Sequence, residues 1–247
     1  VPSFCVGAPT RAAATFRSCS CASSRTRSTH AAWCLLLLPG DVRAGETSPL
    51  GMKRVAQASL KKAGPAQIVV ANAGFGVSGA FETLTLDDFR RQFETNVFGM
   101  IRTALAFLPQ LKETRGTLVL TGSVVGHLSP PGAAPYGMSK YAVRALAESL
   151  RPELALSGVK VVLVSPGFVD TEIHRVDNRG RLHGHAVDAA PRSLMIKPDK
   201  AAAAIARGIR WGCAELVVTW HGKLLVFLSH AAPWLFRLLG RMLAKRL

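Results

Sequence analysis

The chain has 247 residues, 49% of them hydrophobic, which suits a single globular α/β domain with a sizeable core. Its formal net charge is +16, but all fifteen acidic residues lie between Asp41 and Glu215, so more than half of the positive excess belongs to the two ends of the chain. Because the excess does not form a central patch, nucleic-acid binding is not expected.

The cysteines and the apolar runs exclude two further kinds of site. Four of the five cysteines lie in the first 34 residues, and no cluster of Cys and His at metal-ligand spacing follows them. We therefore expect no bound metal and a reduced, cytoplasmic chain. No stretch of about 18 uncharged apolar residues occurs, so no membrane-spanning helix is predicted.

Residues 1–40 differ in composition from the rest of the chain. They are rich in Arg, Ser, Ala and Cys, contain no acid, and show no helical or strand period. An organellar transit peptide has a composition of this kind. The other interpretation is a misassigned start, a reading-frame error or a fragment, which the initial valine favours. We expect an atypical or non-native segment here, followed by a catalytic domain at 41–215.

From residue 65 onward, short β-branched runs alternate with longer helical runs, a pattern typical of βαβ units around a mainly parallel sheet. The predicted strands lie in AQIVVANAG (66–74), GTLVLTGSV (116–124), VKVVLVSPG (159–167) and AELVVTW (214–220). Helices are predicted over about 86–113, 136–156 and 197–211. In such folds ligands bind in the crevice at the carboxyl ends of the strands, so the chemistry is expected there.

Two glycine motifs match known fingerprints without the context that those fingerprints need. GFGVSG at 74–79 satisfies G-x-G-x-x-G, but a helix should open at its last glycine and the helical pattern begins only near Leu86. TGSVVG at 121–126 is not a nucleophile elbow, because Gly122 adjoins Ser123 directly. We therefore expect a loop at the first motif and no acyl-transfer chemistry at the second.

Tyr136 and Lys140 lie four residues apart on a predicted helix and therefore share one face of it. A neighbouring ammonium favours the phenolate and lowers the pKa of a tyrosine from about 10 toward neutral pH, which makes the phenol a usable general acid and base. Ser123, at a strand end thirteen residues earlier, is placed to hold a carbonyl oxygen within reach of the phenol. Taken alone, the pair would favour an ordinary Tyr and Lys on a solvated helix face.

Five motifs in order make the chain resemble the classical short-chain dehydrogenase/reductase family from about residue 41 to residue 215. They are NAG (72–74), FETNVFG (93–99), TGS (121–123), YGMSK (136–140) and SPGFVDT (165–171). The resemblance implies a Rossmann-like, doubly wound parallel sheet. It also implies that hydride is transferred between a nicotinamide cofactor and a small-molecule alcohol or carbonyl substrate. The cofactor would be NADP or NAD, with NADP preferred.

The same resemblance implies a role for each motif residue. Tyr136 would be the catalytic acid and base, Lys140 would tune it and bind the nicotinamide ribose, Ser123 would orient the substrate, and Asn96 would support a water-mediated proton relay. Asp41 and Val42 would contact the adenine, and Asn72, Ala73 and Gly74 would line the adenosine side. The nicotinamide would be flanked by Pro166, Gly167, Val169 and Thr171. Asn96 and Thr171 also have simpler interpretations, a backbone hydrogen bond and a helix cap.

The family's phosphate-binding element, a glycine-rich turn after the first strand, should precede Asp41, and nothing there matches it. We therefore expect a sheet without a normal first βα unit. One interpretation is an oxidoreductase whose N-terminus is incomplete in this sequence. The other is a catalytically silent relative with a partner-binding or membrane-surface role. The joint presence of Asn96, Ser123, Tyr136 and Lys140 favours the oxidoreductase.

Residues 216–247 are expected to form a basic, amphipathic helical tail. They carry five Lys or Arg and no acid, and their longest charge-free run, 224–236, has 13 residues, too few to span a bilayer. The tail could lie in a membrane interface as a peripheral contact, or it could pack on the domain or on a neighbouring subunit. By resemblance to the family, a lipophilic substrate and a homo-oligomer are further expectations.

Overall fold

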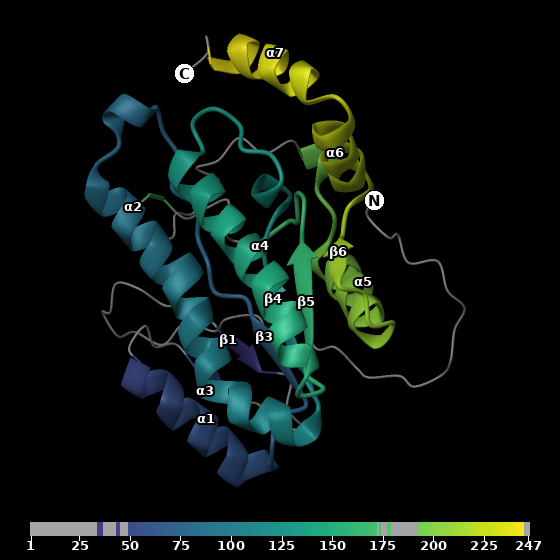
Figure 1. Cartoon of the computed structure of the whole chain (residues 1–247). Helices are drawn as coiled ribbons and strands as arrows, with labels where there is room; N and C mark the ends of the chain where they lie inside the picture. Colours follow the sequence, from purple (N-terminus) through teal and green to yellow (C-terminus); the bar gives the residue numbers. More distant parts are fainter. Residues whose placement is uncertain are drawn as a thin grey trace.

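Figure 1 shows the computed structural model of the chain, which describes residues 34–36, 43–44, 49–171, 173, 177–178 and 192–244. Within these residues six strands form one sheet in the order β2-β1-β3-β4-β5-β6. Four of them run parallel to one another: β3 (Ile68–Ala71), β4 (Thr117–Thr121), β5 (Lys160–Ser165) and β6 (Glu215–Val217). The predicted α/β class with a mainly parallel sheet is therefore confirmed.

The N-terminal edge of the sheet runs the other way. Strand β1 (Cys34–Leu36) lies beside β3, but the two strands are antiparallel. Strand β2 (Arg43–Ala44) then pairs antiparallel with β1. Asp41, Val42 and the segment where a glycine-rich turn was sought lie outside the described residues.

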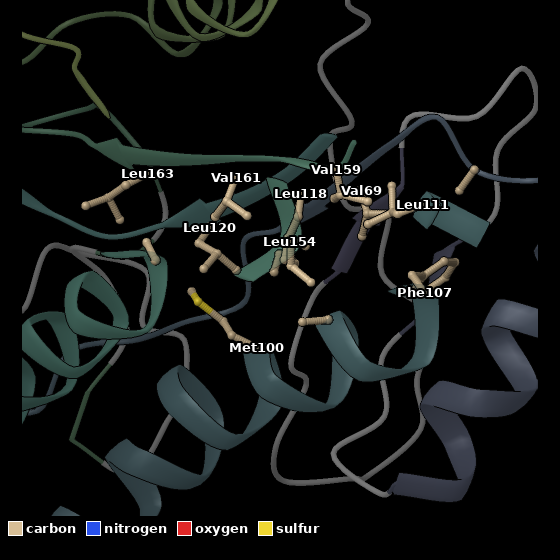
Figure 2. Packing of buried hydrophobic residues seen from close by; sticks show 14 of the residues in the cluster. Val69, Met100, Phe107, Leu111, Leu118, Leu120, Leu154, Val159, Val161 and Leu163 are labelled. Atoms are coloured by element: carbon tan, nitrogen blue, oxygen red, sulfur yellow. The ribbon is translucent and has the colours of Figure 1, made fainter. Parts of the chain in front are cut away.

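Both faces of the central strands are buried, because successive residues of a strand point to opposite sides of the sheet. One face carries the larger core cluster, which includes Phe107 and Met100 from a covering helix (Figure 2) and, from the strands, Val69, Leu118, Leu120, Val161 and Leu163. The alternate residues form a second cluster on the other face: Val70, Val119, Val162 and Val164. The sheet is thus an internal layer between helices.

Helices α1 (Pro49–Ala63), α3 (Gly99–Thr114) and α4 (Ala134–Ala155) supply the core on the first face, and α1 lies beside α3 (Figure 1). Helix α5 (Pro198–Arg210) covers the second face through Ile209 and Ile205. The helices expected near 136–156 and 197–211 are confirmed. Helix α1 was not predicted, although Met52 and Ala56 bury its apolar stripe in the core.

The helix expected over 86–113 is interrupted. Helix α2 (Leu86–Phe93) starts with a capping box, in which Thr85 and Asp88 exchange side-chain and backbone hydrogen bonds. One turn of π-helix, Glu94–Phe98, then joins α2 to α3. Such turns are rare and occur often at functional sites, and this one contains Asn96.

After β6 the chain forms two further helices, α6 (Trp220–Ala231) and α7 (Pro233–Ala244). Thr219 caps α6, because its hydroxyl oxygen accepts a hydrogen bond from the Gly222 N–H at 3.1 Å. Helices α6 and α7 expose large apolar side chains, among them Phe227 on α6 and Trp234 on α7. No helix within the described part of the chain has the length and apolar character that crossing a membrane requires.

Candidate functional site

Lys140 is a buried ammonium at the centre of the site. Its side chain comes from the second turn of α4, is 4% exposed, and donates a hydrogen bond from Nζ to the carbonyl oxygen of Thr121 at 2.9 Å. Burial lowers the pKa of Lys140 from its ordinary 10.5 to about 8. That hydrogen bond is the one it makes to the described residues, so two of its three N–H groups are left to bind a ligand there.

Asn96 is fully buried and holds the loop that follows β3. Its Oδ1 accepts from the Phe75 N–H at 3.1 Å, while its Nδ2 donates to the Phe75 carbonyl and to the Ser139 hydroxyl, both at 3.1 Å. One turn earlier, Gln92 accepts from the Val77 N–H and donates to the Phe75 carbonyl, both at 2.7 Å. The two amides thus pair with this loop much as a neighbouring strand would.

The loop that follows β3 passes close to Asn96, Lys140 and Tyr136. A Cβ on Gly74 would lie 3.0 Å from Oδ1 of Asn96 and 3.6 Å from Nζ of Lys140, and a Cβ on Gly76 would lie 3.7 Å from the Tyr136 ring. Gly74 therefore lets the backbone approach the amide and the ammonium where another side chain would crowd them. The structure brings Asn96, Lys140 and Tyr136 together along one loop.

Tyr136 lies in the first turn of α4 and is half-buried. The ammonium of Lys140 stands over its ring, with Nζ 5.7 Å from the ring centroid. The backbone carbonyl of Tyr136 accepts a hydrogen bond of 2.7 Å from Ser139, the same serine that Asn96 contacts. The Tyr136 phenol therefore has the Lys140 ammonium beside it, and the Ser139 hydrogen bond holds the Tyr136 backbone in place.

Ser123 follows β4 and caps a short 3-10 turn, Val124–Gly126. Its Oγ accepts a hydrogen bond from the Val125 N–H at 3.2 Å. Its own O–H has no acceptor among the described residues and can point to a substrate oxygen. The turn packs closely on α4, since a Cβ on Gly126 would lie 2.8 Å from the carbonyl oxygen of Lys140.

The other sequence-predicted residues line the ends of β3 and β5. Asn72 and Gly74 are exposed and Ala73 is buried, so the NAG loop presents alternate residues outward. Pro166 and Gly167 are half-buried after β5, and Val169 pairs with Ile196 as an isolated parallel bridge. Thr171 is exposed, and its hydroxyl donates to the Val169 carbonyl at 3.5 Å.

A nicotinamide ribose fits these residues. Two N–H groups of Lys140 make no hydrogen bond to the described residues and can donate to ribose hydroxyls. Gly74 lies beside them and has no side chain that would screen the ammonium. The open ends of three adjacent parallel strands form the place where doubly wound folds bind nucleotides. Lys140 and Tyr136 would hold the nicotinamide end of such a cofactor, and Asn96 holds the loop beside them.

Sequence reasoning missed several residues that shape the site. Gln92 precedes Asn96 by one helical turn, and that i, i+4 spacing was a signal that went unused. Ser139 lies inside the YGMSK motif. His127 and Glu215, whose side chains meet behind Ser123 with Nε2 2.7 Å from Oε1, carry no local signal, because 88 residues separate them and only the fold brings them together.

A family model described as short chain dehydrogenase matches residues 28–181, more than half of the chain. The chain therefore belongs to the short chain dehydrogenase family, in agreement with its sheet and with the grouping of Asn96, Tyr136 and Lys140.

Similar proteins include "Uncharacterized oxidoreductase YbbO" of Escherichia coli (strain K12), 42% identical over 101 residues, and "Retinol dehydrogenase 5" of Mus musculus, 36% identical over 135 residues. The matches cover 40% and 53% of this chain but only 38% and 42% of those relatives. Among solved structures, an alcohol dehydrogenase from the archaeon Thermococcus sibiricus, complexed with 5-hydroxy-NADP, is similar with a TM-score of 0.60 and 28% identity. That match covers 70% of this chain and 71% of the other.

Proposed function

We propose that this chain is an NAD(P)-dependent oxidoreductase that transfers hydride between a nicotinamide cofactor and an alcohol or carbonyl carbon. The observation that carries the proposal is the buried Lys140 ammonium, which stands over the Tyr136 ring and has two N–H groups without an acceptor in the described part of the chain. Burying a lone ammonium is unfavourable, and a protein that only needed a stable core would gain nothing from it.

In the proposed reaction the residues of this chain handle the proton and the orientation of the substrate. Tyr136 exchanges a proton with the substrate oxygen, and the Lys140 charge stabilises the phenolate that results. Ser123 donates its O–H to the same oxygen, since its Oγ already accepts from the Val125 N–H. Asn96 keeps the loop at Phe75 in place above them. The bound nicotinamide supplies or accepts the hydride.

We place NADP ahead of NAD as the cofactor. The similar alcohol dehydrogenase from Thermococcus sibiricus is complexed with 5-hydroxy-NADP, which supports that order. The experiment is a titration of the purified 247-residue chain with NADPH and with NADH, followed by cofactor fluorescence and by thermal melting. Saturable binding of NADPH at lower concentration than NADH is expected.

The same titration decides between the enzyme and a catalytically silent relative. A chain that melts cooperatively but binds neither dinucleotide would overturn the proposal. A binding chain is then assayed with NADPH and decanal, using Tyr136→Phe as the test variant. Tyr141→Phe is the matched control, because Tyr141 lies on the same helix, is 43% exposed and is the only other tyrosine in the sequence. We expect activity to be lost in the first variant and kept in the second.

We further propose a lipophilic substrate and a peripheral contact of the chain with membranes. Helices α6 and α7 expose Trp220, Phe227 and Trp234, and from residue 216 onward the sequence contains cations but no acid. Apolar side chains beside cations suit an anionic lipid interface. Co-sedimentation with phosphatidylglycerol vesicles, weakened by Trp234→Glu, is the expected result, and equal sedimentation of the variant would contradict it.

We also propose that the chain forms a homo-oligomer through α3 and α4. Leu105 and Met138 are 65% and 51% exposed on these helices, and Phe98 is exposed beside them. A second copy of the same surface would bury them. Light scattering should give at least a dimer for the wild type and a smaller mass for Leu105→Glu, and a monomeric wild type would refute the proposal.

A further inference from the structure

A cluster of polar side chains lies behind the turn that carries Ser123, and it reaches from buried His127 to partly exposed Glu215. Ser123 caps the turn, the Gly126 N–H donates to the Ser123 carbonyl at 2.9 Å, and the His127 N–H donates to the Val124 carbonyl at 3.0 Å. His127 therefore ends the turn that Ser123 begins. A contact that holds His127 in place therefore also restricts the conformation of Ser123.

The imidazole of His127 reaches two strands at once. Its side chain is 2% exposed, and Nε2 lies 2.7 Å from Oε1 of Glu215 on β6 and 3.3 Å from Oγ of Ser165 at the end of β5. The Ser165 hydroxyl in turn donates to Oε1 of Glu215 at 3.4 Å. The three side chains link the Ser123 turn to β5 and, beyond it, to β6.

Glu215 is placed to act as a carboxylate. Burial would raise its pKa, but the hydrogen bond and the charge of His127, together with the charge of Arg144 on α4, outweigh burial and lower the pKa below its ordinary value. The groups that face the cluster are Arg144, which pairs with Glu148, and His230 of α6, whose ring centroid lies 6.2 Å from that of His127. At neutral pH the cluster therefore contains a negative carboxylate that favours an N–H on Nε2 of His127.

We propose that His127 and Glu215 are positioning residues for Ser123, which they hold so that its O–H points to the substrate oxygen. This inference rests on the proposed oxidoreductase function. Neither residue touches the reacting atoms. Both act through the turn, since Nε2 of His127 is anchored to β6 while its backbone N–H closes the turn on Val124.

A second observation supports an orienting role. The pair lies on the side of the turn where the backbone contacts β5, and the Val124 N–H donates to the Pro166 carbonyl at 3.0 Å. Pro166 belongs to the loop that was predicted to flank the nicotinamide. The cluster thus lies next to the contact between the turn of the serine that would orient the substrate and the loop that would flank the cofactor.

The test compares Glu215→Gln and His127→Leu with Glu148→Gln, which removes the same charge from a carboxylate whose side chain is 54% exposed. His127→Gln is the rescue variant, because its amide nitrogen can donate from near the position of Nε2. Amide hydrogen exchange of the peptide 123–127 reports on the turn without any need for activity. Turnover of decanal with NADPH separates kcat from KM.

We expect exchange in 123–127 to rise about tenfold in Glu215→Gln and His127→Leu, with kcat reduced about tenfold and KM for NADPH unchanged. Exchange and kcat should stay at the wild-type level in Glu148→Gln and return toward it in His127→Gln. Should Glu215→Gln lose its cooperative melt, Ser165→Ala replaces it, because that change removes only the bridging hydroxyl.

Two results would overturn the inference. Equal exchange in Glu215→Gln and Glu148→Gln would show that the pair does not hold the turn. Raised exchange with unchanged kcat would show a pair that stabilises the fold without orienting Ser123. If the wild type binds neither NADPH nor NADH, the proposed function has failed, and the exchange comparison alone then decides whether the pair positions the turn.

Discussion

Replacing Lys140 by Met should abolish activity without lowering the stability of the fold, because burying the charged ammonium destabilises the wild-type protein. Lowering its pKa from 10.5 to about 8 corresponds to about 3 kcal/mol of unfavourable free energy for the charged form in the folded state. Methionine removes that penalty but leaves the Thr121 carbonyl without its donor, which costs about 1–2 kcal/mol. We expect K140M to be as stable as the wild type at pH 7, or up to about 2 kcal/mol more stable, and inactive.

The pH dependence of stability supplies a second signature of Lys140. Between the folded pKa near 8 and the unfolded value of 10.5, the unfolded chain binds a proton at this lysine that the folded chain has lost. Stability therefore rises with pH in this window, by about 2 kcal/mol between pH 7 and pH 9.5. K140M should lack this rise, so its advantage over the wild type should shrink as the pH increases.

Urea unfolding of both proteins at pH 7 and pH 9.5 measures these differences, and Lys112→Met, at an exposed lysine of α3, is the control. Other titrating groups are common to the wild type and the variant and cancel in the comparison. The reasoning is refuted if K140M loses more than about 2 kcal/mol at pH 7 while keeping the wild-type pH dependence, because Lys140 would then carry no burial penalty.

Three further changes test the surroundings of the site. Asn96→Ala leaves the Phe75 N–H without an acceptor in a buried loop and should lower the free energy of unfolding by about 2–4 kcal/mol in urea titration, whereas an unchanged value would mean that Asn96 does not hold the loop. Gly126→Ala should cost about 1–3 kcal/mol because its Cβ would meet backbone at 2.8 Å, while Gly240→Ala, where nothing lies within 4 Å, should be neutral or slightly stabilising. The lowered pKa of Glu215 gives stability that is lost as the pH falls below 4.5 through the folded pKa, so Glu215→Gln should flatten the acid limb of the stability curve, and parallel acid limbs would contradict this.

The sequence by itself determined the class of fold and the neighbouring positions of Tyr136 and Lys140. Alternation of β-branched strands and helical runs predicted β3 to β6, and both faces of these strands proved to be buried. The four-residue interval from Tyr136 to Lys140 was enough to place the ammonium beside the ring. Such signals are local, because the period of a helix or a strand fixes which side chains share a face.

Only the tertiary structure decided what surrounds those residues. The π-turn at Asn96, the antiparallel course of β1 and the support of the Phe75 loop by Gln92 depend on packing between segments rather than on local pattern. Lys140 loses solvent because strands and loops from distant parts of the chain close over α4, and that burial, rather than the sequence interval, lowers its pKa. The link from His127 to Glu215 joins residues 88 positions apart, and no periodicity reaches that far, so only the parallel pairing of β5 with β6 brings the carboxylate behind Ser123.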